Sequence, residues 1–90
     1  MDSVEEIERE TLDMRDTGWK LRKIREAQNL SVTKVANYLG ISGQSVYNWE
    51  LGKTKLDMEH FVLLCNYYKK PYDEVIQTKT VKAFIKDYDE

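Results

Sequence analysis

The stretch LGISGQSVYNWELGK, residues 39–53, has the spacing of a short helix without the composition of a buried one. Val46 and Trp49, three residues apart, supply one narrow apolar stripe, while most of the other positions are polar. Gly40 is the second residue of the stretch, and glycine ends a helix in the left-handed conformation at no steric cost. The stretch therefore predicts a helix over residues 43–51 that follows a sharp turn and presents polar side chains outward.

Another short helix is predicted directly before this turn. Ser31 has the position of an N-cap for a helix over residues 32–39, because its hydroxyl can accept a hydrogen bond from an unpaired amide of the first turn. The small side chain of Ala36 allows the following helix to approach closely. Two short helices that meet steeply at a glycine turn are typical of a helix-turn-helix.

The remaining sequence also reads as helical. No segment shows the alternation that is typical of a strand between turns, so we predict an all-α fold. Further helices are expected over roughly residues 3–15, 19–28 and 57–68, with a short one after Pro71. An extra C-terminal amphipathic helix, able to dock on another chain or on the domain itself, is predicted from the spacing of Val81, Phe84, Ile85 and Tyr88.

Charge divides the chain into unlike segments. The net charge is −2, but residues 1–16 hold seven acidic and two basic side chains, whereas the rest holds nine acidic and twelve basic ones. An anionic partner would therefore meet a mildly basic body. We divide the chain into an acidic helical arm (1–16), a helix-turn-helix domain (17–77) and a C-terminal amphipathic extension (78–90).

Composition argues against several functional classes. Ninety residues suffice for one small core. The chain has one cysteine, Cys65, and one histidine, His60, which is too small a set for a zinc site or a thiol nucleophile, so no catalytic, metal or cofactor site is expected. No apolar run approaches a membrane span, and the start MDSVEEIERE is unlike a signal peptide, which predicts a cytoplasmic protein.

Four segments occur in an order and spacing that identify a family resemblance: LRKIREAQNLS (21–31), VANYLGIS (35–42), VYNWELGK (46–53) and YDEVI (72–76). With them the chain resembles the Xre-type helix-turn-helix family over residues 19 to about 77. The resemblance implies the five-helix, lambda-repressor-like or Cro-like DNA-binding domain. It also implies a buried structural ion pair between Arg25 and Glu50.

The same resemblance implies which residues meet DNA. The helix over residues 43–51 would lie in the major groove, with base contacts from Gly43, Gln44, Ser45, Tyr47 and Asn48. Glutamine and asparagine can each pair with adenine N6 and N7, and this helix has no arginine for guanine, so we expect A·T-leaning half-sites. Phosphate contacts are expected from Ser31, Thr33, Lys34, Ser42, Lys53, Thr54 and Lys55.

The resemblance is incomplete at particular positions. Val32 stands where the family usually has a glutamine that grips phosphate, which would weaken affinity more than fold. Lys69 stands where glycine usually ends the fourth helix, at a cost of about 1 kcal/mol if the residue is left-handed. The exposed Tyr47 could serve either DNA or a protein partner, and Thr33, Thr54 and Ser45 could each be exposed polar residues without a DNA role.

Two functions from different classes fit these observations. The first is a sequence-specific regulator that binds double-stranded DNA as a homodimer, as a repressor of a phage or other mobile element. The alternative is a protein-interaction module, such as an antitoxin or a regulator subunit, with weak DNA binding and a partner on the acidic arm. Reversing the charge of Lys53 and Lys55 would discriminate them, because only the first function would be lost.

Overall fold

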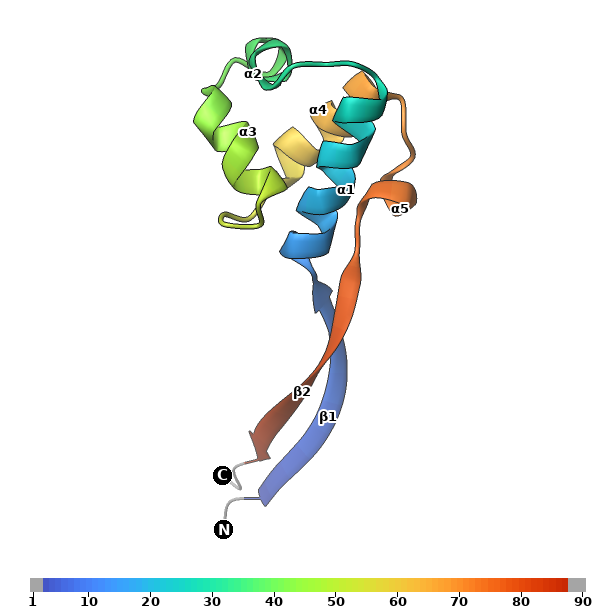
Figure 1. The fold of residues 1–90 in the computed structure, drawn as a ribbon. Coiled ribbons are helices and arrows are strands. Elements are labelled where there is room, and N and C mark those ends of the chain that lie inside the picture. The colour runs from blue at the N-terminus through green and yellow to red at the C-terminus, as the bar shows by residue number, and fades with distance from the viewer. Residues whose placement is uncertain (1–2, 88–90) are drawn as a thin grey trace.

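The computed structural model describes residues 3–87 as a helical head with a two-stranded ribbon extending from it (Figure 1). The head, residues 13–77, contains α1 (Met14–Ala27), α2 (Val32–Leu39), α3 (Gly43–Glu50), α4 (Met58–Tyr68) and α5 (Tyr72–Val75). The ribbon pairs β1 (Ser3–Leu12) with β2 (Thr78–Asp87). The long axis of the molecule measures 57 Å, because the ribbon points away from the helices.

Side-chain caps and one apolar core organise the head. Asp13, Ser31, Ser42 and Asp57 each accept a backbone N–H bond at the start of α1, α2, α3 and α4 respectively. The helices meet around a core of ten buried side chains: Met14, Leu21, Val35, Ala36, Val46, Trp49, Leu64, Cys65, Tyr68 and Val75.

Helix α1 begins five residues earlier than the predicted start at Trp19. The break predicted between two helices at residues 16–18 does not occur, because Asp16, Thr17 and Gly18 all lie inside α1. Thr17 and Gly18 are buried there. Gly18 lies against the end of α3, where a Cβ atom would overlap the carbonyl oxygen of Trp49 and come within 2.9 Å of that of Glu50. The glycine is therefore a site of close helix packing rather than a helix end.

The all-α prediction is wrong at both ends of the chain. The segment predicted as a helix over residues 3–15 forms strand β1 up to Leu12, and the predicted C-terminal helix is strand β2 up to Asp87. Tyr88, on the predicted C-terminal helical face, lies outside the described residues. The strands are antiparallel, with the register running from Ser3 opposite Asp87 to Leu12 opposite Thr78.

Opposite charge explains why these two strands pair. Strand β1 carries four glutamates and one arginine, whereas β2 carries three lysines and one aspartate. Lys82 Nζ lies 3.0 Å from Glu6 Oε1, and the Thr80 hydroxyl donates to the Glu10 carboxylate, which lowers the pKa of Glu10. Cross-strand pairs of this kind stabilise a sheet. The acidic arm is therefore matched by a basic strand from the other end of the chain.

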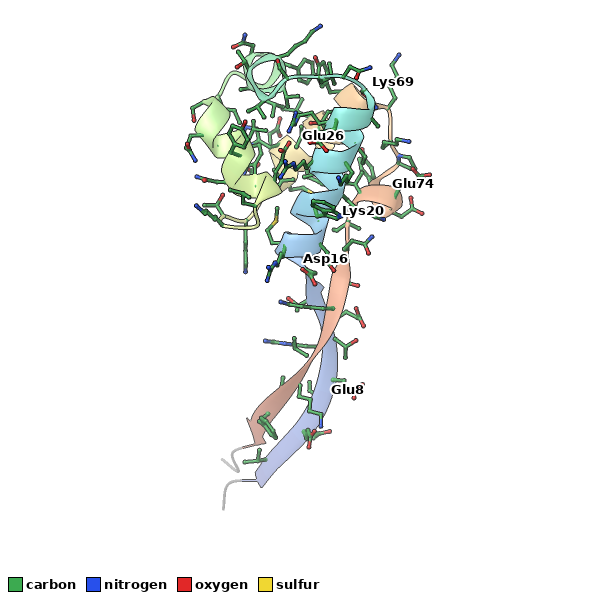
Figure 2. The ribbon with its side chains drawn as sticks, in the orientation of Figure 1. Glu8, Asp16, Lys20, Glu26, Lys69 and Glu74 are labelled. Carbon is green, nitrogen blue, oxygen red and sulfur yellow. The ribbon has the colours of Figure 1, made fainter. Side chains whose placement is uncertain are left out.

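The ribbon is fixed to the head where the two strands enter it. Asp13 N donates to Gln77 O at 2.8 Å, and Gln77 N donates to the buried hydroxyl of Thr17 at 2.9 Å. Nearby, Lys20 Nζ donates to the Glu74 carbonyl at 2.9 Å, which joins α1 to α5 (Figure 2). These contacts connect the base of the ribbon to α1.

Candidate nucleic-acid interface

The turn between α2 and α3 gives the outward helix a fixed position. Gly40 ends α2 in the left-handed conformation, with φ of 71°, and Ile41 N then donates to Ala36 O at 3.1 Å. Val46 and Trp49 are only 2% and 6% exposed, so they hold α3 against the core. Helix α3 consequently lies at the edge of the head, with one side buried and the other free (Figure 1).

The predicted base-contacting residues lie on the outer part of α3. Gln44 and Tyr47 are exposed, while Gly43, Ser45 and Asn48 are half-buried. Gln44 Nε2 donates to Asn48 Oδ1 at 3.0 Å. This bond leaves the Gln44 carbonyl oxygen and the Asn48 amide hydrogens free, so the two side chains offer an acceptor and donors side by side.

The two serines predicted to contact phosphate both act as helix caps. Ser31 Oγ accepts from Lys34 N at 3.0 Å, and Ser42 Oγ accepts from Ser45 N at 3.2 Å. The Ser42 and Ser45 hydroxyls also lie 3.0 Å apart. Capping uses the oxygen as an acceptor, so the hydroxyl of Ser31 keeps a proton that a phosphate oxygen could accept.

The threonines and lysines that are predicted to contact phosphates occur in two groups. Thr33 and Lys34 lie in the first turn of α2, and Lys53, Thr54 and Lys55 lie in the loop after α3. All five are exposed, and no described carboxylate lies within ion-pair distance of the three lysines. Their ammonium groups are available to an anion on both sides of α3.

Arg25 and Glu50 form the ion pair that the resemblance implies. Arg25 Nε donates to Glu50 Oε2 at 2.7 Å and Nη2 donates to Oε1 at 3.0 Å, and the side chains are nearly enclosed. Arg25 Nη1 also donates to Leu30 O at 2.9 Å. The hydrogen bonds with Glu50 raise the pKa of Arg25. The pair fixes the end of α3 to α1, so Glu50 has a structural role.

The departures from the family pattern also have visible consequences. Val32 is half-buried and packs near the start of α3, where a Cβ added to Gly43 would lie 3.5 Å from Val32 Cγ1. It therefore contributes packing where the family usually has an amide. Lys69 ends α4 with φ of 57°, so it takes the left-handed conformation that glycine adopts without strain.

Sequence reasoning missed Arg15 as a member of this surface. The predicted acidic arm, residues 1–16, includes this residue, but Arg15 belongs to the first turn of α1 and is exposed. Its Cα lies 2.8 Å from the position of a Cβ on Gly52, beside the loop that carries Lys53 and Lys55. Only the early start of α1 reveals this neighbourhood, because the two segments are remote in sequence.

His60 and Cys65 have structural surroundings. His60 Nδ1 lies 2.6 Å from Asp57 Oδ2 at the start of α4, and this hydrogen bond lowers the pKa of Asp57. Cys65 is 2% exposed, and burial raises the pKa of its thiol. No helix between Ser3 and Asp87 combines the length and apolar composition needed to cross a bilayer.

Solved structures share this fold. Similar structures include the restriction-modification controller protein C.AhdI from Aeromonas hydrophila, with a TM-score of 0.66 and 24% identity over 70% of this chain and 96% of that one. The BldD DNA-binding domain from S. venezulae has a TM-score of 0.63 and 26% identity over 71% and 96% of the two chains. The clp gene regulator ClgR from C. glutamicum has a TM-score of 0.65 and 18% identity, covering 69% and 80%.

Comparison of the sequence with protein families agrees with the helix-turn-helix geometry of α2 and α3. No curated protein sequence matches the chain. The sequence model described as Helix-turn-helix matches residues 21–75, which include α2, the turn and α3 and exclude both strands of the ribbon. The chain therefore belongs to the helix-turn-helix family, of the Xre type that its sequence resembles.

Proposed function

We propose that this protein is a transcriptional regulator that binds double-stranded DNA sequence-specifically, with α3 in the major groove. The observation that carries the proposal is the amide pair of Gln44 and Asn48 on the outer part of a helix anchored by Val46 and Trp49. A helix of this diameter fits the major groove, where each base pair presents a distinct set of donors and acceptors. The similarity of the fold to the BldD DNA-binding domain supports the same role.

The chemistry of the exposed amides favours adenine. An adenine edge offers one donor, N6–H, and one acceptor, N7, in the major groove. The Gln44 carbonyl oxygen can accept from N6 while its second amide hydrogen donates to N7, even when its first hydrogen is bonded to Asn48. We therefore assign Gln44 and Asn48 to base contacts in A·T-leaning half-sites, together with Gly43, Ser45 and Tyr47.

Cations on either side of α3 are assigned to the DNA backbone. Lys34 would bind phosphate beside the start of α2, while Lys53 and Lys55 would bind it beyond the end of α3. Hydroxyls or backbone amides for the same DNA backbone would come from four further residues: Ser31, Thr33, Ser42 and Thr54. We add Arg15, because it lies against Gly52 beside the lysine loop.

A homodimer on an inverted repeat fits a domain with one recognition helix per chain. A dimer that occupies a promoter excludes polymerase, so repression is the proposed mode of action, with a phage or other mobile element as the proposed context. The dimer would double the number of phosphates neutralised and steepen the dependence of affinity on salt.

The proposal is tested by selecting sites from a randomised DNA pool and measuring the affinity of the selected duplex by fluorescence anisotropy. Enrichment of A·T-containing half-sites is expected, and Gln44→Ala and Asn48→Ala should each weaken specific binding by about 1–3 kcal/mol. Asn66→Ala, on α4, is the matched control and should leave affinity unchanged. A pool without enrichment would contradict the proposal and favour a protein partner.

The assignment of Arg15 has its own test in the salt dependence. Three phosphates neutralised by lysine per half-site predict a slope of log K against log salt of about −2.7, and a fourth neutralised by Arg15 predicts about −3.6. Arg15→Ala should therefore reduce the slope by about 0.9 per half-site without changing the preferred sequence. Lys70→Ala is the control; this lysine directly follows Lys69, the residue that ends α4 (Figure 2). An unchanged slope in Arg15→Ala would remove Arg15 from the interface.

A further inference from the structure

The ribbon has an unpartnered face that the helix-turn-helix head does not explain. Cross-strand neighbours in an antiparallel pair point to the same side, so the register places Ile7, Ala83, Val81 and Ile85 together. Ile85 is 48% exposed, and the other three are half-buried. We call these four residues the aliphatic face. The opposite face is mixed: it carries the exposed apolar side chains of Val4 and Phe84 beside four charged ones, Glu6, Glu8, Glu10 and Lys82.

A cover for the aliphatic face is expected on energetic grounds. An isolated two-stranded ribbon is marginally stable in water, and stability comes from a third strand or from packing on another element. The head contacts the ribbon at its base, where Leu12 packs against the core. Hydrogen bonds among Asp13, Thr17 and Gln77 lie at the same place. The outer part of the ribbon therefore has no described neighbour within its own chain (Figure 1).

The charges around the aliphatic face make it complementary to itself. Arg9 lies two residues from Ile7 on the side of the head, and Glu5 lies two residues from Ile7 on the side of the tip. Neither Arg9 nor Glu5 has an ion-pair partner among the described side chains. A second ribbon, stacked face to face and running in the opposite direction about Ile7, would bring each Arg9 over the other copy's Glu5.

We infer that the aliphatic face is the surface by which two copies of this chain associate, with their ribbons stacked antiparallel and their heads at opposite ends. This interface would belong to the homodimer of the proposed function, and the observations that support it come from the ribbon alone. Stacking with the heads at the same end would place Arg9 and Lys79 of both copies close together, which is repulsive.

Pairing through the strand edges fits the charges less well. A symmetric sheet would place β1 beside its copy, with four glutamates in each strand, or β2 beside its copy, with three lysines in each. Like charges on adjacent strands are destabilising, and such charges protect sheet edges from association. Face-to-face stacking keeps both edges in solvent and uses the opposite charges of Glu5 and Arg9.

The size of the face predicts a modest affinity. Ten residues per strand span about 33 Å, and two strands with their side chains are about 12 Å wide, which gives roughly 400 Å² per copy. The total of roughly 800 Å² is below the roughly 1,200–2,000 Å² that stable specific interfaces bury, so the ribbon alone supports a weak, transient association. We therefore expect a dimer that dissociates at micromolar concentration and is strengthened when both heads bind one DNA molecule.

Charge reversal and charge exchange test the interface without DNA. Sedimentation velocity of the full chain, from micromolar to submillimolar concentration, should show a monomer–dimer equilibrium. Glu5→Arg and Arg9→Glu should each weaken association at least about 10-fold, because each places two like-charged pairs across the interface. The double variant Glu5→Arg/Arg9→Glu should restore the wild-type dissociation constant. Glu59→Arg, which reverses the same charge on α4 in the head, should have little effect.

The rescue by charge exchange separates an interface from damage to the ribbon. A chain that stays monomeric over this range, or a double variant no better than the single ones, would overturn the inference. Equal weakening by Glu59→Arg would overturn it as well. A DNA duplex with one half-site provides the separate test of the head, because a monomeric Glu5→Arg variant should bind it with wild-type affinity if the proposed function is right.

Discussion

At the scale of single residues, Gly18 decides how closely α1 and α3 approach. A glycine inside a helix ordinarily lowers helix stability by about 1 kcal/mol relative to alanine. Here the missing side chain makes room for the backbone of Trp49 and Glu50. Packing therefore overrides helix propensity at this position, which is why the sequence alone indicated a helix break.

Gly18→Ala is expected to destabilise the protein by about 1–3 kcal/mol, despite the better helix propensity of alanine, because the added methyl group overlaps a carbonyl oxygen. Urea unfolding followed by circular dichroism measures the change. Gly43→Ala is the matched control, since its Cβ would make an ordinary contact of 3.5 Å with Val32. A stabilised Gly18→Ala variant would contradict the packing of α1 on α3.

Lys69 presents the opposite case, a residue in a conformation that suits glycine. Glycine would remove left-handed strain of about 1–2 kcal/mol and lose about 0.4–1 kcal/mol through the greater freedom of the unfolded chain. Lys69→Gly should therefore increase the free energy of unfolding by up to about 1 kcal/mol. Lys70→Gly has only the second effect, because Lys70 lacks a positive φ, and should decrease it. Equal changes of the same sign would show that Lys69 is not left-handed.

At the scale of elements, the sequence predicts the bounds of those helices whose start and end signals lie within the helix and its caps. The bounds of α2 follow from the Ser31 cap and the glycine at its end, and α3 ends within one residue of its prediction. Sequence reasoning failed for β1 and β2, because each strand depends on a partner at the other end of the chain. Ile7 and Thr11 have helical spacing within their own segment, and only the charge pattern of the two ends carried a signal of pairing.

The base-contacting and phosphate-contacting assignments on α3 and its loops came from the resemblance, and the structure shows that Gln44, Tyr47 and the three lysines are exposed. Arg15 could not be assigned in advance, because its neighbourhood with Gly52 depends on the start of α1 and on the close packing at Gly18. The two strands and the position of Arg15 were not predicted for the same reason: the spacing of residues along the chain does not reveal contacts between segments that are remote in sequence.

The junction between ribbon and head predicts the effect of Thr17→Val. The hydroxyl of Thr17 accepts from Gln77 N and lies 3.3 Å from Gln77 O, so valine leaves a half-buried amide without its partner. A loss of about 1–3 kcal/mol is expected, with faster amide hydrogen exchange concentrated in β1 and β2. Thr54→Val, at an exposed position, is the control. Unchanged exchange in both strands would show that the ribbon does not depend on this contact.

At the scale of the whole molecule, the head and the ribbon have separate tasks, one toward DNA and one toward a second copy. Stacking about Ile7 would place the two bases of the ribbons about 34 Å apart, since Leu12 and Thr78 lie five residues from the centre. Each head lies beyond its own base (Figure 1), so the recognition helices are more than one helical turn of DNA apart.

We therefore expect the dimer to bind an inverted repeat whose half-sites are centred two helical turns apart, roughly 68 Å, more tightly than a repeat with one-turn spacing. Anisotropy titrations on duplexes that differ only in spacing measure this. Glu5→Arg should abolish the preference while leaving binding to a single half-site intact. A preference for one-turn spacing would contradict antiparallel stacking of the ribbons.

The central claim, that the amides of α3 read adenine, is tested most directly by a double-mutant cycle between Asn48→Ala and 7-deazaadenine in the selected half-site. Replacing N7 by carbon removes the acceptor and leaves the rest of the base pair in place. Wild-type protein is expected to lose about 1–3 kcal/mol of binding free energy at the contacted adenine, whereas Asn48→Ala should lose almost nothing further. Equal losses in both proteins would mean that Asn48 does not contact that base.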